Sequence, residues 1–457
     1  MKIVLWIVLI LIALLVIDAK TPAFAWLSKL IARPDFNLIN SFPPIEYGPD
    51  RLVPKMDDDG NYYYETDRAL RVMQLTDVHF GCGLFTRKAD KKAMNAIYAM
   101  LAAEKPDLCI FTGDQIYPVI FQSGTFNNLL ETRFFIAFME HLGCYYTVTM
   151  GNHESEIYSP GSRKKIAELY DSPENHFCIF KTGEDIAAGI SKGRTGFDKL
   201  PPSVQKTAIS TEIKDFGYGN QVIKVKNSVG LITQAIFTMD THSYTHGDYF
   251  GILYLYDGLH QTQIDWYEET LQKLAEENRN VLAALQEKSG GSGADQVPET
   301  AGGESAGSCM PPSCVFMHMP LGEYKTAFNE IRENNEKPTA DARLVFGSMT
   351  ETGKREIYCS VYPDSMFETV QRLGSTKAFF CGHDHKNFFS IEYKGVRLTY
   401  GRAIDYFVYR GIGKQGRQRG CIMIEAKPDG SLTITPESYY QDKYSGVFPK
   451  ETDIKDL

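Results

Sequence analysis

The chain has 457 residues, of which 43% are hydrophobic and 12% aromatic, so it can bury a sizeable core. The length allows two or three average domains, or one large domain with insertions. A formal net charge of −9 argues against broad nucleic-acid binding by charge alone, and we expect no nucleic acid as a stable partner.

The N-terminal residues are typical of a targeting segment. An unbroken apolar run from residue 3 to residue 17 is shorter than the roughly 20 residues that span a bilayer comfortably. Residues 23–25 read Ala-Phe-Ala and resemble a signal-peptide cleavage site, although Asp18 and Lys20 lie in between. Residues 1–25 are therefore predicted to be a signal peptide or, as the rival, an uncleaved membrane anchor. In both cases we expect an extracytoplasmic protein, secreted or anchored to the membrane.

Nine cysteines are scattered along the chain, several of them inside apolar runs where a thiol is usually a small buried hydrophobic group. Cys309 and Cys314 are close in sequence, so a local disulfide is one expectation for an exported protein. The spacing is not that of a zinc knuckle.

The first half of the chain predicts strands that alternate with helices. Residues 26–70 are rich in Pro, Asp and Tyr and are expected to form an irregular lead-in. Short apolar runs predict buried strands, and longer segments between them have helical character. The strands are expected at 71–76, 107–112 and 145–150, and the helices at 90–103 and 128–142. This alternation predicts an α/β fold.

The second half is less regular. Residues near 155–220 are polar and contain Gly and Pro, so we expect an insertion over the site, and a second insertion near 286–312 includes a Gly- and Ser-rich flexible loop at 288–308. A single domain is predicted from 71 to 450. Strands are expected at 221–225, 231–239, 314–317 and 377–381, a helix at 261–278, and a closing antiparallel set at 388–393, 396–400 and 421–425.

Polar residues follow the predicted strands at regular intervals. Asp77 and Asp114 are 37 positions apart, and Asp114 and Asn152 are 38 apart. Because one β-α-β unit takes about 30 residues or more, each polar residue comes one unit after the last, at the C-terminal end of a strand. Ligand sites of open α/β sheets gather at that edge.

Three further blocks extend this set of candidate ligands. His79 is two residues from Asp77, and strand alternation would place both side chains on one side. His318 follows Val-Phe-Met, and His383 and His385 follow Ala-Phe-Phe-Cys-Gly. Each block alone is a weak or moderate signal. Together they supply seven oxygen and nitrogen ligands, which suit two metal ions that share one carboxylate.

These blocks resemble the calcineurin-like metallophosphoesterase superfamily in its Asp-x-His form, over about residues 71–425. The segments Phe-Met-His-Met-Pro-Leu-Gly-Glu-Tyr (316–324) and Gly-His-Asp-His-Lys-Asn (382–387) resemble a purple-acid-phosphatase-like branch. The resemblance implies a four-layer α/β/β/α sandwich with a dinuclear metal site at the strand ends.

The resemblance also implies a role for each candidate residue. The first metal would be held by Asp77, His79 and His385, the second by Asn152, His318 and His383, and Asp114 would bridge them. His153 would be catalytic, contacting the phosphate and stabilising the leaving oxygen, and Glu154 would lie behind the ligands. True purple acid phosphatases use a tyrosine ligand where this chain has Tyr117. Because His79 already completes the first site, we expect Tyr117 to be a wall residue.

The activity that follows is metal-dependent hydrolysis of a phosphoric ester, phosphomonoesterase-like, in which a hydroxide bridging two divalent ions attacks phosphorus. Ligands without thiolate suit Mn, Fe or Zn, and the sequence does not choose among them. A phosphodiesterase acting on nucleotides or lipid phosphates is the nearest alternative. A non-catalytic surface protein on the same scaffold is another. Residues 240–244 and 406–420 could line the mouth of the site or be plain connecting loops.

Overall fold

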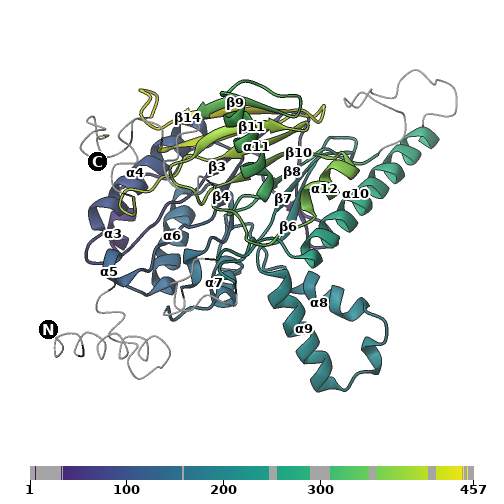
Figure 1. Ribbon diagram of the computed structural model, residues 1–457, viewed down its shortest axis with the longest axis horizontal. Coiled ribbons are helices and arrows are strands. Elements are labelled where there is room, and N and C mark those ends of the chain that lie inside the picture. The colour runs from purple at the N-terminus through teal and green to yellow at the C-terminus, as the bar shows by residue number, and fades with distance from the viewer. Residues whose placement is uncertain are drawn as a thin grey trace.

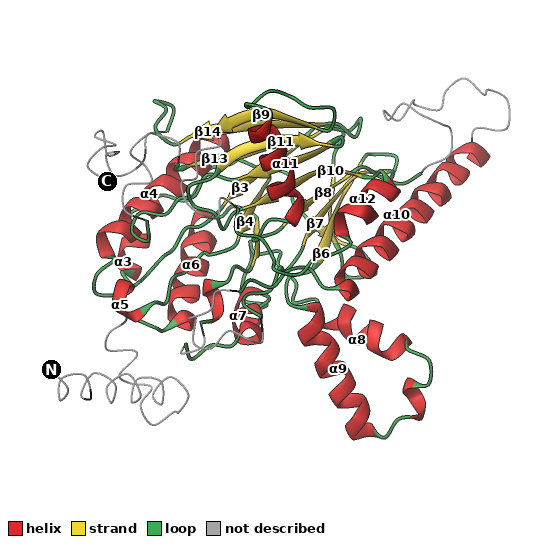
Figure 2. Ribbon diagram, viewed as in Figure 1, coloured by secondary structure: helices red, strands yellow, loops and turns green. Residues whose placement is uncertain are grey.

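The computed structural model describes residues 6, 32, 34–156, 159–245, 255–288, 309–348, 357–409, 418–444, 446 and 450. Two β-sheets lie in the middle of the molecule, and helices cover their outer faces (Figures 1 and 2). Of the predicted N-terminal segment at 1–25 only residue 6 is described, and of the predicted loop at 288–308 only residue 288 is described. Among the described residues, no helix combines the length and the apolar character that a membrane crossing requires.

The smaller sheet has the strand order β14-β13-β3-β4-β5, in which β3, β4 and β5 are parallel neighbours. Its strands are β3 (Leu70–Leu75), β4 (Leu108–Thr112), β5 (Tyr146–Thr149), β13 (Gly420–Ala426) and β14 (Leu432–Ser438). The connecting helices are α4 (Arg87–Glu104) and α6 (Asn128–Leu142), preceded by the short α5 (Ile120–Ser123). The predicted alternation of strands and helices in the first half is confirmed.

The larger sheet has the order β1-β2-β6-β7-β8-β10-β12-β11-β9. Its strands are β1 (Lys55–Met56), β2 (Tyr62–Glu65), β6 (Gln221–Lys226), β7 (Ile232–Thr238), β8 (Ser313–Phe316), β9 (Ala342–Ser348), β10 (Thr376–Cys381), β11 (Phe388–Tyr393) and β12 (Val396–Tyr400). Strands β7, β8, β10 and β12 run parallel, so their C-terminal ends meet at one edge.

The prediction that residues 388–393, 396–400 and 421–425 form one antiparallel set is wrong. Strands β11 and β12 do pair in antiparallel fashion, but β12 is also parallel to β10. Strand β13 belongs to the other sheet, where it pairs with β3 and β14. A pattern of apolar residues predicts a strand but not the sheet to which the strand belongs, because the strands of both sheets in a sandwich have the same pattern.

Three hydrophobic clusters define four layers. One lies between the smaller sheet and α4 and α6, and it includes Phe111, Ile97 and Phe135. A second lies between the two sheets, where Ile110 of β4 and Phe316 of β8 are both fully buried. The third joins the larger sheet to α10 (Gln261–Lys288), α11 (Gly322–Glu333) and α12 (Met366–Leu373). The α/β/β/α sandwich is thus confirmed.

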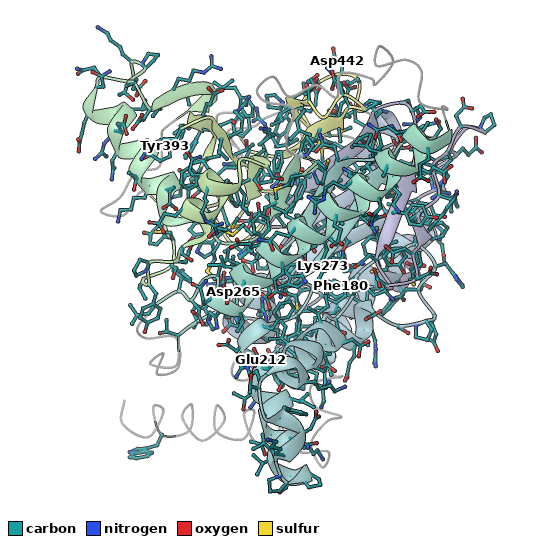
Figure 3. All side chains as sticks on the ribbon, turned by 90° about the vertical axis from the view of Figure 1, so that its right-hand side faces the viewer. Phe180, Glu212, Asp265, Lys273, Tyr393 and Asp442 are labelled. Atoms are coloured by element: carbon teal, nitrogen blue, oxygen red, sulfur yellow. The ribbon has the colours of Figure 1, made fainter. Side chains whose placement is uncertain are left out.

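The lead-in and the first insertion contain regular elements. Residues 34–70 include the short helix α3 (Phe36–Ile39), and β2 pairs with β6. The segment after β5 forms η2 (His153–Ser155), α7 (Arg163–Tyr170), α8 (Glu184–Gly193), η3 (Phe197–Lys199) and α9 (Pro202–Phe216). Helices α8 and α9 project from the sandwich, and Glu212 of α9 marks this projection in Figure 3. Helix α10 runs ten residues beyond its predicted end at 278.

The expected disulfide is absent, since Cys309 and Cys314 are both free thiols. Cys314 lies in β8 with its side chain in the core between the sheets, where its neighbours are apolar. Burial raises the pKa of this thiol to about 12, so it stays protonated and behaves as a small hydrophobic group.

Candidate metal centre

The candidate ligands meet where the C-terminal ends of strands from both sheets converge. Asp77 and His79 follow β3, Asp114 follows β4, and Asn152 follows β5. From the larger sheet, His318 follows β8, and His383 and His385 follow β10. Because the two sheets pack face to face, these two edges lie close together. The structure therefore gathers all seven residues that the sequence singled out.

Glycines directly before three ligands allow the loops to approach one another closely. A Cβ on Gly113 would lie 2.1 Å from Nδ1 of His318, and one on Gly151 would lie 2.0 Å from Oδ1 of Asp114. A Cβ on Gly382 would lie 1.9 Å from Oγ1 of Thr76. Real Cβ atoms do not come this close to other atoms, so only glycine fits at these positions.

The loop backbones that carry the ligands are strained. Asp77, His79, Asp114 and His383 have φ values of 50°, 52°, 53° and 75°. Left-handed conformations of non-glycine residues cost on the order of 1–3 kcal/mol each and cluster at functional sites. Strand alternation was thus the wrong reason for grouping Asp77 with His79, because β3 ends at Leu75 and the left-handed turns aim both side chains.

The first group of donors consists of Asp77, His79, Asp114 and His385, all buried, with one ligand atom of each within 4.8 Å of the others. Nε2 of His79 lies 3.3 Å from Oδ2 of Asp114, and Nε2 of His385 lies 3.4 Å from Oδ1 of Asp77. Two ligands about 2.1 Å from one ion are roughly 3.0–3.4 Å apart in octahedral or tetrahedral geometry. These nitrogen–oxygen separations fit ligands arranged around a cation.

The second group consists of Asp114, His318 and His383, again within 4.8 Å of one another. Nδ1 of His318 donates to the Thr112 carbonyl at 2.8 Å, which leaves Nε2 facing Oδ2 of Asp114 at 3.3 Å. Oδ1 of Asn152 lies 3.2 Å from the same nitrogen. Asp114 belongs to both groups, so its carboxylate lies between two sets of donors.

Electrostatics inside the cluster depend on Asp114. Burial by itself raises the pKa of this carboxyl, but the charges of His318 and His153 outweigh burial and hold the pKa well below its usual range. Burial also opposes the charge on His318, yet Asp114 raises the pKa of that imidazole to about 9. Burial lowers the pKa of His383 far below its ordinary value, which favours the neutral form that binds metals.

His153 differs from the ligands in its exposure and its contacts. Its side chain is 19% exposed, against 0% for His79 and His318. Nδ1 lies 2.7 Å from Oε1 of Glu156, and Nε2 lies 4.0 Å from Oδ2 of Asp114. Burial lowers the pKa of His153, but the charges of Asp114 and Glu156 raise it above its ordinary value overall. The imidazole thus reaches from the solvent side toward the shared carboxylate.

Asp405 is a buried carboxylate of the site that sequence reasoning missed. Oδ2 lies 3.3 Å from Nδ1 of His385, and Oδ1 lies 4.0 Å from Nδ1 of His79. Backbone N–H groups of Phe407 and Tyr409 donate to its oxygens at 2.9 Å. Carboxylates behind ligating histidines fix the ring orientation and tautomer. Its only sequence signal is that it follows a strand, as the ligands do.

Two more charged side chains hold the ligand loops together. Glu154, expected behind the ligands, accepts hydrogen bonds from the N–H groups of Gln115 and Gly151, each at 2.7 Å. Arg163 of α7 donates to the Gly151 carbonyl at 2.8 Å and forms a buried ion pair with Asp240. Arg163, which the sequence did not reveal, thereby ties the loop after β5 to the segment after β7.

Aromatic rings surround the cluster. Tyr117, expected to be a wall residue, packs edge-on against His79 and His153, with ring centroids 5.2 and 4.6 Å apart. Tyr244 accepts a hydrogen bond from Nδ2 of Asn152 at 2.9 Å, so residues 240–244 do contact the site. Tyr256 packs against the ring of His383 at 4.5 Å. These contacts leave Oδ1 of Asn152 and the His383 ring facing the donor groups.

Comparison with known proteins matches the sequence to a family. The family described as calcineurin-like phosphoesterase matches residues 70–299. Probable inactive purple acid phosphatase 14 of Arabidopsis thaliana is 26% identical over 81% of this chain and 78% of its own length. Phosphatase DCR2 of Saccharomyces cerevisiae is 23% identical over 76% of this chain, but over only 48% of its own length.

A dimetal phosphatase from Danio rerio is similar among solved structures, with a TM-score of 0.43 and 8% sequence identity over 82% of this chain and 98% of that one. The family match spans half of the 457 residues and includes Asp77, His79, Asp114 and Asn152. The protein therefore belongs to the calcineurin-like phosphoesterase family, a family of phosphoric ester hydrolases.

Proposed function

We propose that the chain is an active, metal-dependent hydrolase of phosphoric monoesters. The observation that carries this proposal is the position of Asp114. One of its oxygens lies 3.3 Å from Nε2 of His79 on one side and 3.3 Å from Nε2 of His318 on the other. A carboxylate placed between two histidine groups suits a pair of divalent ions.

Each ion has a set of donors in this scheme. Asp77, His79, Asp114 and His385 would hold one, and Asp114, Asn152, His318 and His383 the other. When bound, the two ions supply Lewis acidity toward the phosphoryl oxygens and a water acidic enough to attack phosphorus. Donors of nitrogen and oxygen without thiolate suit Mn, Fe or Zn.

The chain's own contribution to bond cleavage centres on His153. Glu156 holds Nδ1, so Nε2 points toward the cluster and can donate a proton to the leaving oxygen. Tyr117 and Tyr244 pack beside the ligands and limit the access of water.

Three Arabidopsis relatives are named as probable inactive purple acid phosphatases. The donor set of the present chain argues for activity, because all seven candidate ligands converge and Asp405 lies behind His385. A scaffold kept only for binding has no need for strained loops and three sterically required glycines.

We also propose that the protein acts outside the cytoplasm. The support is the apolar run at residues 3–17, followed by the Ala-Phe-Ala sequence at 23–25. N-terminal sequencing of the exported protein distinguishes a cleaved signal peptide from a retained membrane anchor.

The test is hydrolysis of matched aryl phosphate mono- and diesters by the full chain, stripped of metal and reloaded with Mn, Fe or Zn. Metal-dependent turnover that prefers the monoester is the expected result. Preference for the diester would make the chain a phosphodiesterase, with nucleotides and lipid phosphates as the next substrates. Two bound ions per chain with no turnover on either ester would indicate a non-catalytic role.

A further inference from the structure

A second cluster of histidines and aspartates lies outside the centre described above. His242 follows β7, and Asp257 and His260 precede α10. One ligand atom from each of the three lies within 4.8 Å of the others. The projecting helix α9 ends beside the start of α10, where Figure 3 labels Asp265. No step of phosphoester hydrolysis uses these residues.

The rings of His242 and His260 each have a hydrogen-bond partner at Nδ1, so Nε2 lies on the opposite side of the ring. Nδ1 of His242 lies 3.0 Å from the Gly258 carbonyl, and Nδ1 of His260 lies 2.9 Å from Oδ1 of Asp215. A histidine that ligates a metal typically donates its other N–H to a carbonyl or carboxylate in this way. Asp215 is itself fixed by the hydroxyl of Thr262 at 2.8 Å.

The remaining nitrogens have different surroundings. Nε2 of His260 lies 3.1 Å from Oδ1 of Asp257, a separation that fits two ligands of one ion. Nε2 of His242 is buried and has no hydrogen-bond partner among the described residues. An orphaned nitrogen of this kind calls for an explanation, and a metal ligand is one.

We propose that His242, Asp257 and His260 form a third metal site, suited to zinc. Two imidazoles and one carboxylate are a common donor set for this ion, with water in the fourth position. The two rings are stacked, with centroids 4.1 Å apart and planes 13° from parallel. Zinc binding therefore requires one ring to tilt out of the stack, so that both lone pairs meet a single ion.

The position of the site gives it a structural role. His242 follows β7, and Asp257 and His260 precede α10, so a shared ion would join these two places in the chain. Near these two places, Tyr244 contacts Asn152 and Tyr256 packs on His383. A metal that joins two distant points of a chain reduces the conformational entropy of the unfolded state. The third ion thus holds two aromatic residues against ligands of the catalytic pair.

The test is the zinc content per chain of the full-length protein after zinc loading and desalting, measured by mass spectrometry of the metal. His242→Gln is expected to contain one zinc fewer than the wild type. His176→Gln, at an exposed histidine, is the matched control and should match the wild type. Because the test compares the zinc content of two variants, its outcome does not depend on whether the two ions of the proposed function are bound. Equal zinc content in wild type and His242→Gln would overturn the proposal.

Two further variants cover the case in which His242→Gln does not fold. Asp257→Asn keeps an oxygen to accept the Gly258 N–H, now bonded at 3.0 Å, but removes the anionic ligand. It should also lose one zinc and should lose the corresponding zinc-dependent rise in Tm. Asp215→Asn should retain the ion with an affinity about 10- to 100-fold lower, because Asp215 acts through His260. A Tm response to zinc that is identical in wild type and Asp257→Asn would identify the cluster as an ion-pair network only.

Discussion

Two clusters built from the same residue types differ in burial. In the candidate metal centre, the side chains of His79 and Asp114 are 0% and 1% exposed. In the second cluster, those of His260 and Asp257 are 29% and 18% exposed. Isolated buried charges are costly and require partners, whereas half-exposed ones are solvated. We therefore expect the candidate metal centre to depend more strongly on bound cations, while the second cluster can exist as a set of ion pairs and gain a metal.

The largest expected effect comes from removing the shared carboxylate. Asp114→Asn should lower kcat/KM by more than about 10³-fold, because both ions lose their common anionic ligand. Metal content should fall together with activity. Asp198→Asn, at an exposed aspartate on the α8–α9 projection, is the control. If Asp114→Asn kept both activity and metal, the cluster around Asp114 would be no more dependent on cations than the cluster of His242, Asp257 and His260.

A smaller loss of activity is expected at the edge of the catalytic cluster. His153→Gln should lower kcat by roughly 10²- to 10⁴-fold through loss of the proton donor, with the metal content unchanged. Steady-state kinetics and metal analysis on the same preparation separate the two effects. Loss of an ion in this variant would make His153 a ligand instead.

Asp405→Asn examines the support behind the ligands. We expect metal affinity to fall about 10- to 100-fold, since the orientation of His385 is no longer fixed by a carboxylate. Asn keeps an oxygen to accept the N–H groups of Phe407 and Val408 and loses only the hydrogen bond from Tyr409, so the fold should persist. Competition with a chelator gives the affinity, and an unchanged value would mean that Asp405 only stabilises its own loop.

The smallest expected effect concerns a buried acid that has no cation beside it. Glu131 of α6 is fully buried, and the backbone of Tyr117 only partly offsets the effect of burial on its carboxyl group. Burial raises its pKa well above the ordinary value, in contrast to Asp114, whose pKa neighbouring histidines lower. Above the ordinary pKa of a glutamate, Glu131 is ionised in the unfolded chain but keeps its proton in the folded protein. Its contribution therefore makes the folded protein less stable as pH rises.

Glu131→Gln should remove this dependence. Its free energy of unfolding should match that of wild type near pH 4 and exceed it increasingly toward pH 8, by at most about 1.4 kcal/mol per pH unit. Urea denaturation at several pH values measures the difference. A constant difference across this range would show that Glu131 is ionised in the fold despite its burial.

Local sequence patterns indicated the strands and helices of the first half and the candidate ligands that the structure brings together. Apolar runs fixed the strands, and the intervals between Asp77, Asp114 and Asn152 followed from the length of a β-α-β unit. These are short-range properties, which a single sequence can report. The four-layer arrangement came from a family resemblance rather than from the pattern itself.

Only the tertiary structure decided which sheet takes each strand and which residues meet across the sheets. Strand β13 pairs with β3, about 350 positions earlier in the chain, because the edge of the smaller sheet was open to it. Asp405, Arg163 and the cluster of His242, Asp257 and His260 gain their roles from contacts between distant segments. Such contacts leave no periodic trace in the sequence, since they depend on packing and not on local spacing.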